Sequence, residues 1–395
     1  MILIENGMVW TGNKEDSPSN RTILIDGQTI RHIFTKDKEI DVPEDVERID
    51  ASSKFVLPGL INCHAHICLD GSPDPVSSML NDGMFRVSIK AAESAKRILM
   101  QGVTTIRDLG GWQGIDIALR DAINDGIIPG PRMLVSGKVL CMTGGHGRTM
   151  GCEVDGSDEA RKAARMQLKS NVDLIKVIAT GGVMTEGVEP GSPQLTIDEM
   201  KAAVEEAEKA GRRVACHAHG NTGILNALKA GVHTVEHGTF LDERAVDMMI
   251  ERNVYYTPTV IAPKRIADVR AEAGIPKYVV RKVGEMIKHR IKSLHLAYEK
   301  GVNIVTGTDA GTPMNPHEDL IEEFLILKKE CMTSQEVLAA ATSVAGKALG
   351  IESQVGTLEE GKIADLIIID GNPFDDIGAL RDISVIIRAG KVIVQ

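Results

Sequence analysis

The chain has 395 residues, of which 43% are hydrophobic and 25% are charged, a composition typical of a globular protein. Its net charge of −10 argues against nucleic acid or an anionic membrane surface as a partner. No window approaches a membrane span, and Glu5 interrupts the N-terminal apolar residues, so neither a membrane protein nor a signal peptide is predicted.

The two ends of the chain are predicted to be rich in β-strands. Short β-like segments fill residues 1–55, and residues 355–395 look similar, with turn pairs such as Asp26-Gly27 and Ala389-Gly390 between them. Because the ends resemble each other and differ from the middle, we predict that they build one small β-sandwich domain together.

Strand-like runs alternate with helical patterns between these ends. Capping boxes at Thr196–Glu199 and Thr333–Glu336 open two of the helices, which are expected to end at Gly211 and near Gly350. Eight apolar runs lie between helices, at residues 60–66, 103–108, 132–137, 172–180, 213–219, 233–238, 254–259 and 303–309. Eight β/α units over residues 56–354 predict an α/β fold, a (β/α)8 TIM-type barrel. A doubly wound sheet is the rival, but it would rarely need so many near-equal units.

The first run ends in two histidines around one small residue. Residues i and i+2 of a strand point to the same face, so His64 and His66 project together while Cys63 and Ala65 face the helices. Active sites of barrels lie at the C-terminal ends of the strands, where two imidazoles about 7 Å apart can bind one metal. Two histidines held only by hydrogen bonds are the alternative.

Three other runs end in the same kind of side chain. The fifth run ends with His217 and His219, the sixth with His237, and the eighth with Asp309. Each polar residue closes an apolar run where the mouth of a barrel would be. Together they favour a metal site over a purely structural set.

Lys176 lies inside an apolar run, VDLIKVIAT at residues 172–180. A buried, unpaired ammonium is costly, so its pKa should fall. The neutral amine could add carbon dioxide and give a carbamate whose two oxygens bridge two metals. The alternative is a lysine that snorkels or pairs with a carboxylate, and residue chemistry alone does not decide between the two.

Two histidines are left over as possible hydrogen-bond donors. His219 shares a face with His217 but lies one step nearer the mouth, and His146 sits in a Gly-rich loop after the third run. Either could donate to an oxyanion or to a substrate carboxylate. The alternative for both is a supporting or solvent-exposed role.

Other side chains near the predicted mouth could contact substrate. Arg148 could pair with a carboxylate, and only one of Tyr255 and Tyr256 can face the pocket, because adjacent strand residues point to opposite faces. His317 could touch substrate from the loop after the eighth run, although a surface histidine is commoner. His233 is expected to share the inward face with His237, one layer deeper. An acidic cluster could attract a cationic substrate, but charge runs are usually solvated; it comprises Glu318, Asp319, Glu322 and Glu323.

These motifs together resemble the metal-dependent amidohydrolase superfamily, over essentially the whole chain. The resemblance rests on HAH at 64–66, LIKVIATGG at 174–182, HAHG at 217–220, VEHG at 235–238, GTDAG at 307–311 and GTLEEGKIADLIIID at 356–370. The most similar group is the imidazolonepropionase-like and prolidase-like members, which include Xaa-Pro dipeptidases and carboxypeptidases that release C-terminal Arg or Lys. TGGHG at 143–147 and ATGGVMT at 179–185 are similar to loops of those carboxypeptidases.

The resemblance implies a binuclear metal site. It assigns six ligands: His64, His66 and Asp309 for the more buried metal, His217 and His237 for the more exposed one, and a carboxylated Lys176 as the bridge. Two zinc ions are expected, because imidazole and oxygen ligands suit zinc.

The implied reaction is hydrolysis by a hydroxide that both metals share, since the cations lower the pKa of water. The exposed metal polarises an amide carbonyl, while Asp309 takes the proton of the hydroxide and passes it to the leaving amine. Asp309 is thus the expected acid and base, and His146 and His219 are the candidate catalytic donors.

The expected substrate is a small molecule, either a dipeptide or an N-acyl amino acid cleaved at its C-terminal residue. Deaminases of the superfamily typically carry a Glu where this chain has Gly220, and they usually lack the bridging lysine. Cyclic amide or lactone hydrolysis is the alternative. A non-catalytic scaffold is disfavoured because every implied metal-binding position is present. We also expect a cytoplasmic protein with reduced cysteines, and a homo-oligomer, as barrels of this kind often pair.

Overall fold

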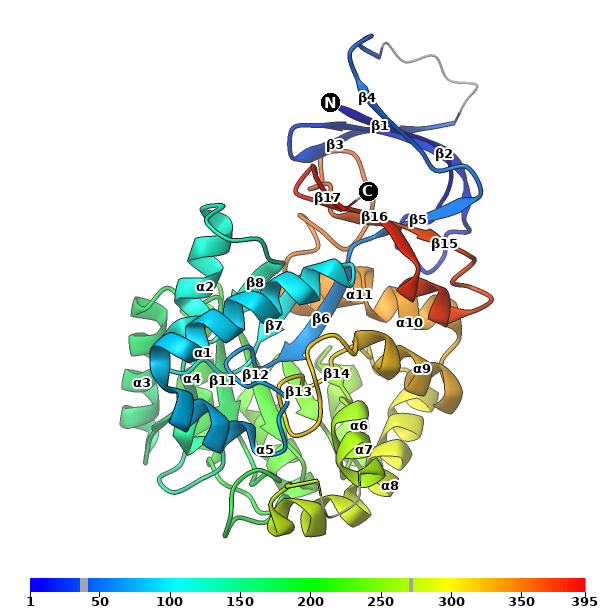
Figure 1. Ribbon diagram of the computed structural model, residues 1–395. Coiled ribbons are helices and arrows are strands. Elements are labelled where there is room, and N and C mark those ends of the chain that lie inside the picture. The colour runs from blue at the N-terminus through cyan, green and yellow to red at the C-terminus, as the bar shows by residue number, and fades with distance from the viewer. Residues whose placement is uncertain (36–41, 270–272, 395) are drawn as a thin grey trace.

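The computed structural model describes residues 1–35, 42–269 and 273–394 (Figure 1). Two regions are visible in the view. A mixed β-sheet built from both chain ends lies at the top, and a group of parallel strands surrounded by helices lies below it. Within the described residues, no helix is long and apolar enough to cross a membrane.

The described residues of the upper region form eight strands in one sheet. The strands are β1 (Ile2–Val9), β2 (Ser19–Asp26), β3 (Thr29–Phe34), β4 (Glu47–Asp50), β5 (Lys54–Pro58), β15 (Leu366–Asp370), β16 (Ile383–Arg388) and β17 (Lys391–Val394). Their order is β17-β16-β15-β5-β1-β2-β3, and β4 pairs with β1. Antiparallel pairing of β15 with β5 joins the two chain ends, with Ile367 opposite Leu57.

The strands of this sheet share one apolar core, because alternate residues of each strand point to the same side. Ile4, Ile23, Val56, Leu366 and Ile387 are fully buried in it. Continuous backbone pairing links all the strands into one sheet, so the sandwich predicted from the sequence is not confirmed. The sheet also extends past the expected boundary at residue 55, since β5 ends at Pro58.

The lower region is built on two parallel sheets. One has the order β6-β7-β8, and the other β10-β9-β11-β12-β13-β14. The strands are β6 (Leu60–Ala65), β7 (Val103–Asp108), β8 (Arg132–Val135), β9 (Val139–Cys141), β10 (Gly151–Glu153), β11 (Leu174–Ile178), β12 (Arg213–Ala218), β13 (Thr234–His237) and β14 (Tyr255–Thr257). Each predicted run from 60–66 to 254–259 contains one of these strands. The short strands β9 and β10, which flank the loop of His146, were not predicted.

The eighth predicted run, residues 303–309, forms no regular strand but makes backbone contacts on both sides. Tyr256 N donates to Asn303 O at 2.9 Å, and Asp309 N donates to His64 O at 2.9 Å. Parallel bridges also join Tyr256 to Ile304 and Ala65 to Ala310. This segment therefore lies between β14 and β6, an arrangement consistent with a TIM-type barrel.

Helices cover the outer side of the parallel strands (Figure 1). They are α1 (Pro75–Met100), α2 (Ile115–Asn124), α3 (Ser157–Lys169), α4 (Ile197–Lys209), α5 (Asn221–Ala230), α6 (Glu243–Glu251), α7 (Ile261–Asp268), α8 (Lys277–Lys300), α9 (Leu320–Glu330), α10 (Ser334–Ala340) and α11 (Ser343–Leu349). Two short 3₁₀ turns are η1 (Arg148–Met150) and η2 (Ile377–Arg381). Outward strand residues such as Val177, Cys216 and Val235 are fully buried against this layer.

Both predicted capping boxes are present. The Thr196 hydroxyl accepts from Glu199 N, and the Glu199 carboxylate accepts from Thr196 N at 2.7 Å, at the start of α4. The helix that opens at Thr333 is shorter than predicted. It ends at Ala340, because Thr342 adopts a non-helical backbone (φ −137°, ψ −94°), and α11 then starts afresh.

Candidate active site

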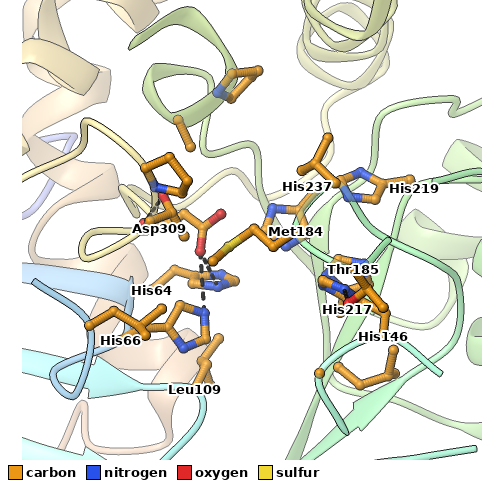
Figure 2. A pocket seen from close by; sticks show the side chains of 18 of the residues that line it. His64, His66, Leu109, His146, Met184, Thr185, His217, His219, His237 and Asp309 are labelled. Atoms are coloured by element: carbon orange, nitrogen blue, oxygen red, sulfur yellow. Dashed lines mark hydrogen bonds and ion pairs between the residues drawn. The ribbon is translucent and has the colours of Figure 1, made fainter. Parts of the chain in front are cut away.

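A pocket lies at the C-terminal ends of the parallel strands and carries most of the predicted polar residues on two sides (Figure 2). His64, His66 and Asp309 form one cluster, and His217, His219 and His237 form the other. Within each cluster, the candidate ligand atoms lie within 4.8 Å of one another. Both clusters therefore have the side chains and the spacing that a metal ion needs.

The first cluster is placed by the alternation of β6. Asn62 and His64 point into the strand assembly, while Cys63 packs outward against α11. Asp309 reaches the same point from the segment beside β6, with a left-handed backbone (φ 58°). Its Oδ1 lies 3.3 Å from Nε2 of both His64 and His66. The predicted meeting of these three side chains is thus present.

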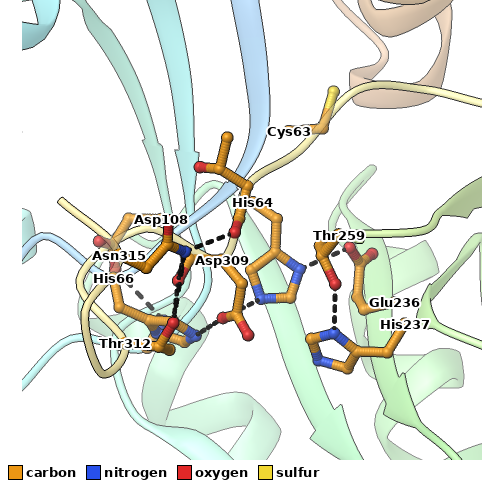
Figure 3. Close-up of polar contacts among 12 residues, drawn as sticks. Cys63, His64, His66, Asp108, Glu236, His237, Thr259, Asp309, Thr312 and Asn315 are labelled. Atoms are coloured by element: carbon orange, nitrogen blue, oxygen red, sulfur yellow. Dashed lines mark hydrogen bonds and ion pairs between the residues drawn. The ribbon is translucent and has the colours of Figure 1, made fainter. Parts of the chain in front are cut away.

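A buried chain of charges holds His64 in place, and Figure 3 shows its contact with Glu236. Nη2 of Arg107 lies 2.7 Å from Oε1 of Glu236, and Oε2 of Glu236 lies 2.9 Å from Nδ1 of His64. A carboxylate only accepts, so Nδ1 of His64 carries the proton. Nε2 then has no proton to donate, and although Oδ1 of Asp309 lies 3.3 Å away, Nε2 is buried with no hydrogen-bond partner among the described residues. An orphaned imidazole nitrogen backed by a carboxylate is the arrangement that metal-binding histidines usually have.

The charge states in this cluster suit metal binding. Burial alone would raise the pKa of Asp309, but the imidazoles of His64 and His66 outweigh it and hold the pKa well below its usual value. Burial also lowers the pKa of His66 from 6.5. A carboxylate and neutral imidazoles are the forms that coordinate metals.

The second cluster comes from two neighbouring strands. His217 and His219 share the inward face at the end of β12, and their ring centroids are 4.6 Å apart. Nε2 of His217 donates to Gly181 O at 3.3 Å, and because a carbonyl only accepts, Nδ1 of His217 is free to bind a metal. Burial lowers the pKa of His217 and His237 well below 6.5, so both rings are neutral.

His237 reaches the cluster in a way that strand alternation does not predict. Thr234 and Glu236 point inward, where both contact Arg107, so His237 would face the helices in a regular strand. A left-handed backbone (φ 72°) at its position turns the ring into the pocket instead. The prediction that His233 lies below His237 is wrong, because Nδ1 of His233 accepts from Val214 N at the other end of the strands.

Lys176 is buried in the same pocket, with 2% of its surface exposed. It faces inward from β11, as alternation predicts, since Ile175 and Val177 pack against the helices. No other described residue makes a hydrogen bond or ion pair with it. Burial lowers its pKa from 10.5 to about 8, so a substantial fraction is neutral amine near that pH.

Lys176 also acts on both clusters electrostatically. Burial is the main reason for the lowered pKa values of His66 and His217, and the Lys176 ammonium adds to the effect in each case. Lys176 thus lines the pocket that both clusters share.

His146 and His219 line the pocket as predicted. The ring of His146 lies 4.5 Å from that of His217, and its Nδ1 is 2.9 Å from the Thr185 hydroxyl. Burial lowers the pKa of His146 to about 3, so the ring is a neutral donor or acceptor.

Three predicted substrate contacts do not line this pocket. Arg148 is exposed and donates to Gly144 O in its own loop. Tyr255 pairs with Thr234 and so shares the inward side of the strands, but it lies at their N-terminal ends beside His233 and Arg213, away from this pocket. His317 is buried, and its Nε2 donates to Leu69 O at 2.8 Å, so its ring supports the backbone of a pocket residue and does not itself line the pocket.

Several residues that hold the site were not predicted. Arg107 and Glu236 are charged residues at inward positions of fully buried strands, and a charged residue within a strand-like run was a usable signal, as it was for Lys176. Thr239, Thr259 and Arg290 surround the second cluster, but nothing in their local sequence marks them.

Glu236→Gln should lower the free energy of unfolding by about 3 kcal/mol, because it leaves the buried Arg107 guanidinium without its anionic partner. Urea unfolding of the metal-free protein measures this change. Glu251→Gln, at an exposed position at the end of α6, is the matched control and should change stability little. Equal stability of the two variants would contradict the role assigned to the ion pair.

Comparison with known proteins agrees with this geometry. A model of the amidohydrolase family matches residues 55–394. Ochratoxinase of Aspergillus niger is 30% identical over 427 residues, covering 99% of this chain and 85% of the relative. The crystal structure of a Xaa-Pro dipeptidase with bound methionine in the active site matches with a TM-score of 0.91 and 34% identity over 100% of both chains. A prolidase complexed with N-methylphosphonate-L-proline matches with a TM-score of 0.91 and 29% identity, over 100% of this chain and 99% of the other.

Proposed function

The chain belongs to the amidohydrolase family and is a hydrolase, and on that premise we propose that it is a binuclear zinc enzyme on a (β/α)8 barrel. Its proposed reaction is cleavage of the amide bond of dipeptides or N-acyl amino acids at the C-terminal residue. One observation carries the proposal: two clusters of metal-ligand side chains and one buried, unpaired lysine line the same pocket.

The residues present fit a pair of cations. His64 and His66 would hold one ion with Asp309, and His217 and His237 would hold the other, each through a neutral ring nitrogen. A carboxylated Lys176 would supply an oxygen to both. Bound in this way, the cations would lower the pKa of water and polarise a carbonyl group.

Asp309 is the residue proposed to move the proton. Its carboxylate is ionised and faces the pocket, and the left-handed backbone together with the hydrogen bond from Asn315 Nδ2 to Asp309 O at 3.0 Å fixes its direction. It can accept a proton from water at its second oxygen and pass it to the leaving amine. His146 and His219 are proposed to donate hydrogen bonds to the carbonyl oxygen or the carboxylate of the substrate.

The walls of the pocket support an apolar C-terminal residue. Apart from the histidines, Lys176, Arg290, Asp309 and three threonines, the lining is mostly apolar, with side chains such as Leu69, Leu109, Ile178, Met184, Ile266 and Met286. Among the described residues that line it, Asp309 is the only carboxylate. A cationic substrate side chain would therefore be buried without a partner, which is costly. The bound methionine and proline analogue of the two similar structures are apolar in the same way.

The acidic cluster in the loop after Asp309 does not change this conclusion, because its carboxylates are already engaged. Glu318 pairs with Arg97, Asp319 with Arg265, and Glu322 with Arg381. Glu323 is buried and accepts from Val260 N and Ile261 N at the start of α7. None of the four lines the pocket, so release of C-terminal Arg or Lys is disfavoured.

Matched N-acetyl amino acids and dipeptides test the proposal on zinc-loaded protein. We expect N-acetyl-Leu, -Met and -Phe to be hydrolysed with kcat/KM more than about 100-fold above N-acetyl-Arg and -Lys, since an unpaired buried charge costs several kcal/mol. Protein stripped with a chelator should be inactive until zinc returns. Faster hydrolysis of the cationic substrates would contradict the apolar pocket. If the enzyme hydrolyses hydantoins or lactones and none of the open-chain amides, the proposed reaction is wrong and the alternative, cyclic amide or lactone hydrolysis, takes its place.

A further inference from the structure

Arg290 is a buried cation beside the second cluster, with 2% of its surface exposed. Each of its three guanidinium nitrogens donates to the protein. Nε donates to Thr239 Oγ1 at 3.1 Å, and Nη1 donates to Thr259 O at 2.9 Å and to Thr259 Oγ1 at 3.1 Å. Nη2 donates to Thr239 Oγ1 at 2.9 Å and contacts Nδ1 of His219 at 3.2 Å.

These contacts use all the donors that Arg290 has. A guanidinium carries five N–H groups, and each can be matched to one of the contacts above. Arg290 therefore has no free donor with which to bind a substrate carboxylate. In the part of the chain that is described, no carboxylate pairs with it either. Any influence of Arg290 on the reaction must therefore act through the residues that it contacts, which are Thr239, Thr259 and His219.

The hydroxyl of Thr239 connects Arg290 to His219 through hydrogen bonds. Its hydroxyl oxygen has two lone pairs, and both accept from Arg290. The hydroxyl hydrogen is then left to donate, and the nearest acceptor is Nδ1 of His219, at 2.8 Å. Nδ1 of His219 thus faces two donors, the hydroxyl of Thr239 and Nη2 of Arg290.

This arrangement decides which nitrogen of His219 carries the proton. A neutral imidazole has one N–H, and since Nδ1 accepts, the proton is on Nε2. A protonated nitrogen cannot coordinate a metal. His64 shows the opposite arrangement, because the carboxylate of Glu236 takes its Nδ1 proton and leaves Nε2 free. Histidines that bind metals usually have an acceptor behind them, as His64 has, and not a donor.

We propose that Arg290 is a positioning residue which, with Thr239, holds His219 as the Nε2–H tautomer, so that His219 donates to the carbonyl oxygen of the substrate and does not bind metal. This role in the reaction rests on the proposed function. The spacing of His217, His219 and His237 alone would allow a metal ion held by all three. With His219 excluded, the second ion needs another ligand besides His217 and His237, and Lys176 is in place to supply it.

Nitrogen NMR of histidine-labelled protein tests the tautomer without any substrate. Long-range ¹H–¹⁵N correlations should show His219 protonated at Nε2 in both the metal-free and the zinc-loaded protein, with His219→Asn used to assign the signal. The double variant Thr239→Val/Arg290→Met removes both donors and should populate the other tautomer. Thr105→Val removes a buried hydroxyl that has no hydrogen-bond partner among the described residues, and it should change nothing. A proton on Nδ1, or a zinc-bound Nε2, in the wild-type protein would overturn the proposal.

Kinetics test the consequence for catalysis. The double variant should lose about 100-fold in kcat, the cost of one oxyanion donor, with KM and zinc content changed less than about twofold. Thr239→Ser keeps the hydroxyl and should retain both the wild-type tautomer and most of kcat. Equal loss in Thr239→Ser and Thr239→Val, or an unchanged kcat in the double variant, would contradict the positioning role. If the wild-type enzyme hydrolyses none of the acyl amino acids, the proposed function fails, while the NMR result still decides the tautomer.

Discussion

Lys176→Ala should purify with about one zinc ion per chain or fewer, against about two for the wild-type protein, and should lose most hydrolase activity. The reason is that Lys176 lines the pocket that both clusters share and has no hydrogen-bond or ion-pair partner among the described residues. Without Lys176, the proposed site has no group that could supply an oxygen ligand to both metal ions. Metal analysis of the purified variant measures the loss directly.

The chemistry behind this expectation starts from the lowered pKa of Lys176, about 8. In the proposed function, the neutral amine would add carbon dioxide, with formation of one N–C bond and release of one proton, to give a carbamate. That group has two oxygens and a negative charge where the ammonium would repel both cations. Short carboxylic acids such as propionate, which fit the space that the lysine side chain vacates in the Lys176→Ala variant, should partly restore zinc content and activity.

Lys138→Ala is the matched control for this experiment. Lys138 is an exposed lysine between β8 and β9, so its removal should leave zinc content and activity unchanged. Unchanged zinc content in Lys176→Ala would contradict the bridging role. Loss of zinc in both variants would point to a general effect on stability instead.

Asp309→Asn should keep its zinc and lose about 10²- to 10⁴-fold in kcat, because an amide cannot take up and return the proton that the reaction moves. The substitution is mild for the fold. Asn tolerates the left-handed backbone of this position (φ 58°) and retains one oxygen as a ligand. Zinc analysis and steady-state kinetics of the same preparation separate the two effects.

Asp125→Asn, at the exposed C-terminal end of α2, is the control and should behave as wild type. A fully active Asp309→Asn would show that another group carries the proton. Loss of zinc together with activity would mean that Asp309 acts mainly as a ligand, and the assignment of proton transfer to it would then be wrong.

Strand alternation predicted more of the site than any other signal. It placed His64 and Lys176 on the inward face, because hydrophobic neighbours on both sides fixed which face was which. It failed at His237, where a left-handed backbone turns the ring. It also gave no depth for Tyr255, which is on the inward side but lies too deep to line the pocket. A period-two pattern contains no information about a single residue that leaves the regular strand conformation.

The supporting residues were harder to predict from sequence because their partners are distant in the chain. Arg290 bonds to a threonine 51 positions earlier, and Arg107 to a glutamate 129 positions later. No local sequence signal distinguishes Arg290, since one arginine in a helix with many charged residues is ordinary. The irregular backbone of residues 303–309 could not be predicted for a similar reason. The path of this segment is defined by its contacts with β14 and β6, which are distant in the chain.

Anomalous diffraction at the zinc edge, from crystals of zinc-loaded protein, tests the central claim most directly. Our account predicts two zinc peaks, one beside His64 and His66 and one beside His217 and His237, with electron density for a carboxyl group on Nζ of Lys176. A single peak held by His217, His219 and His237, with an unmodified lysine, would contradict it.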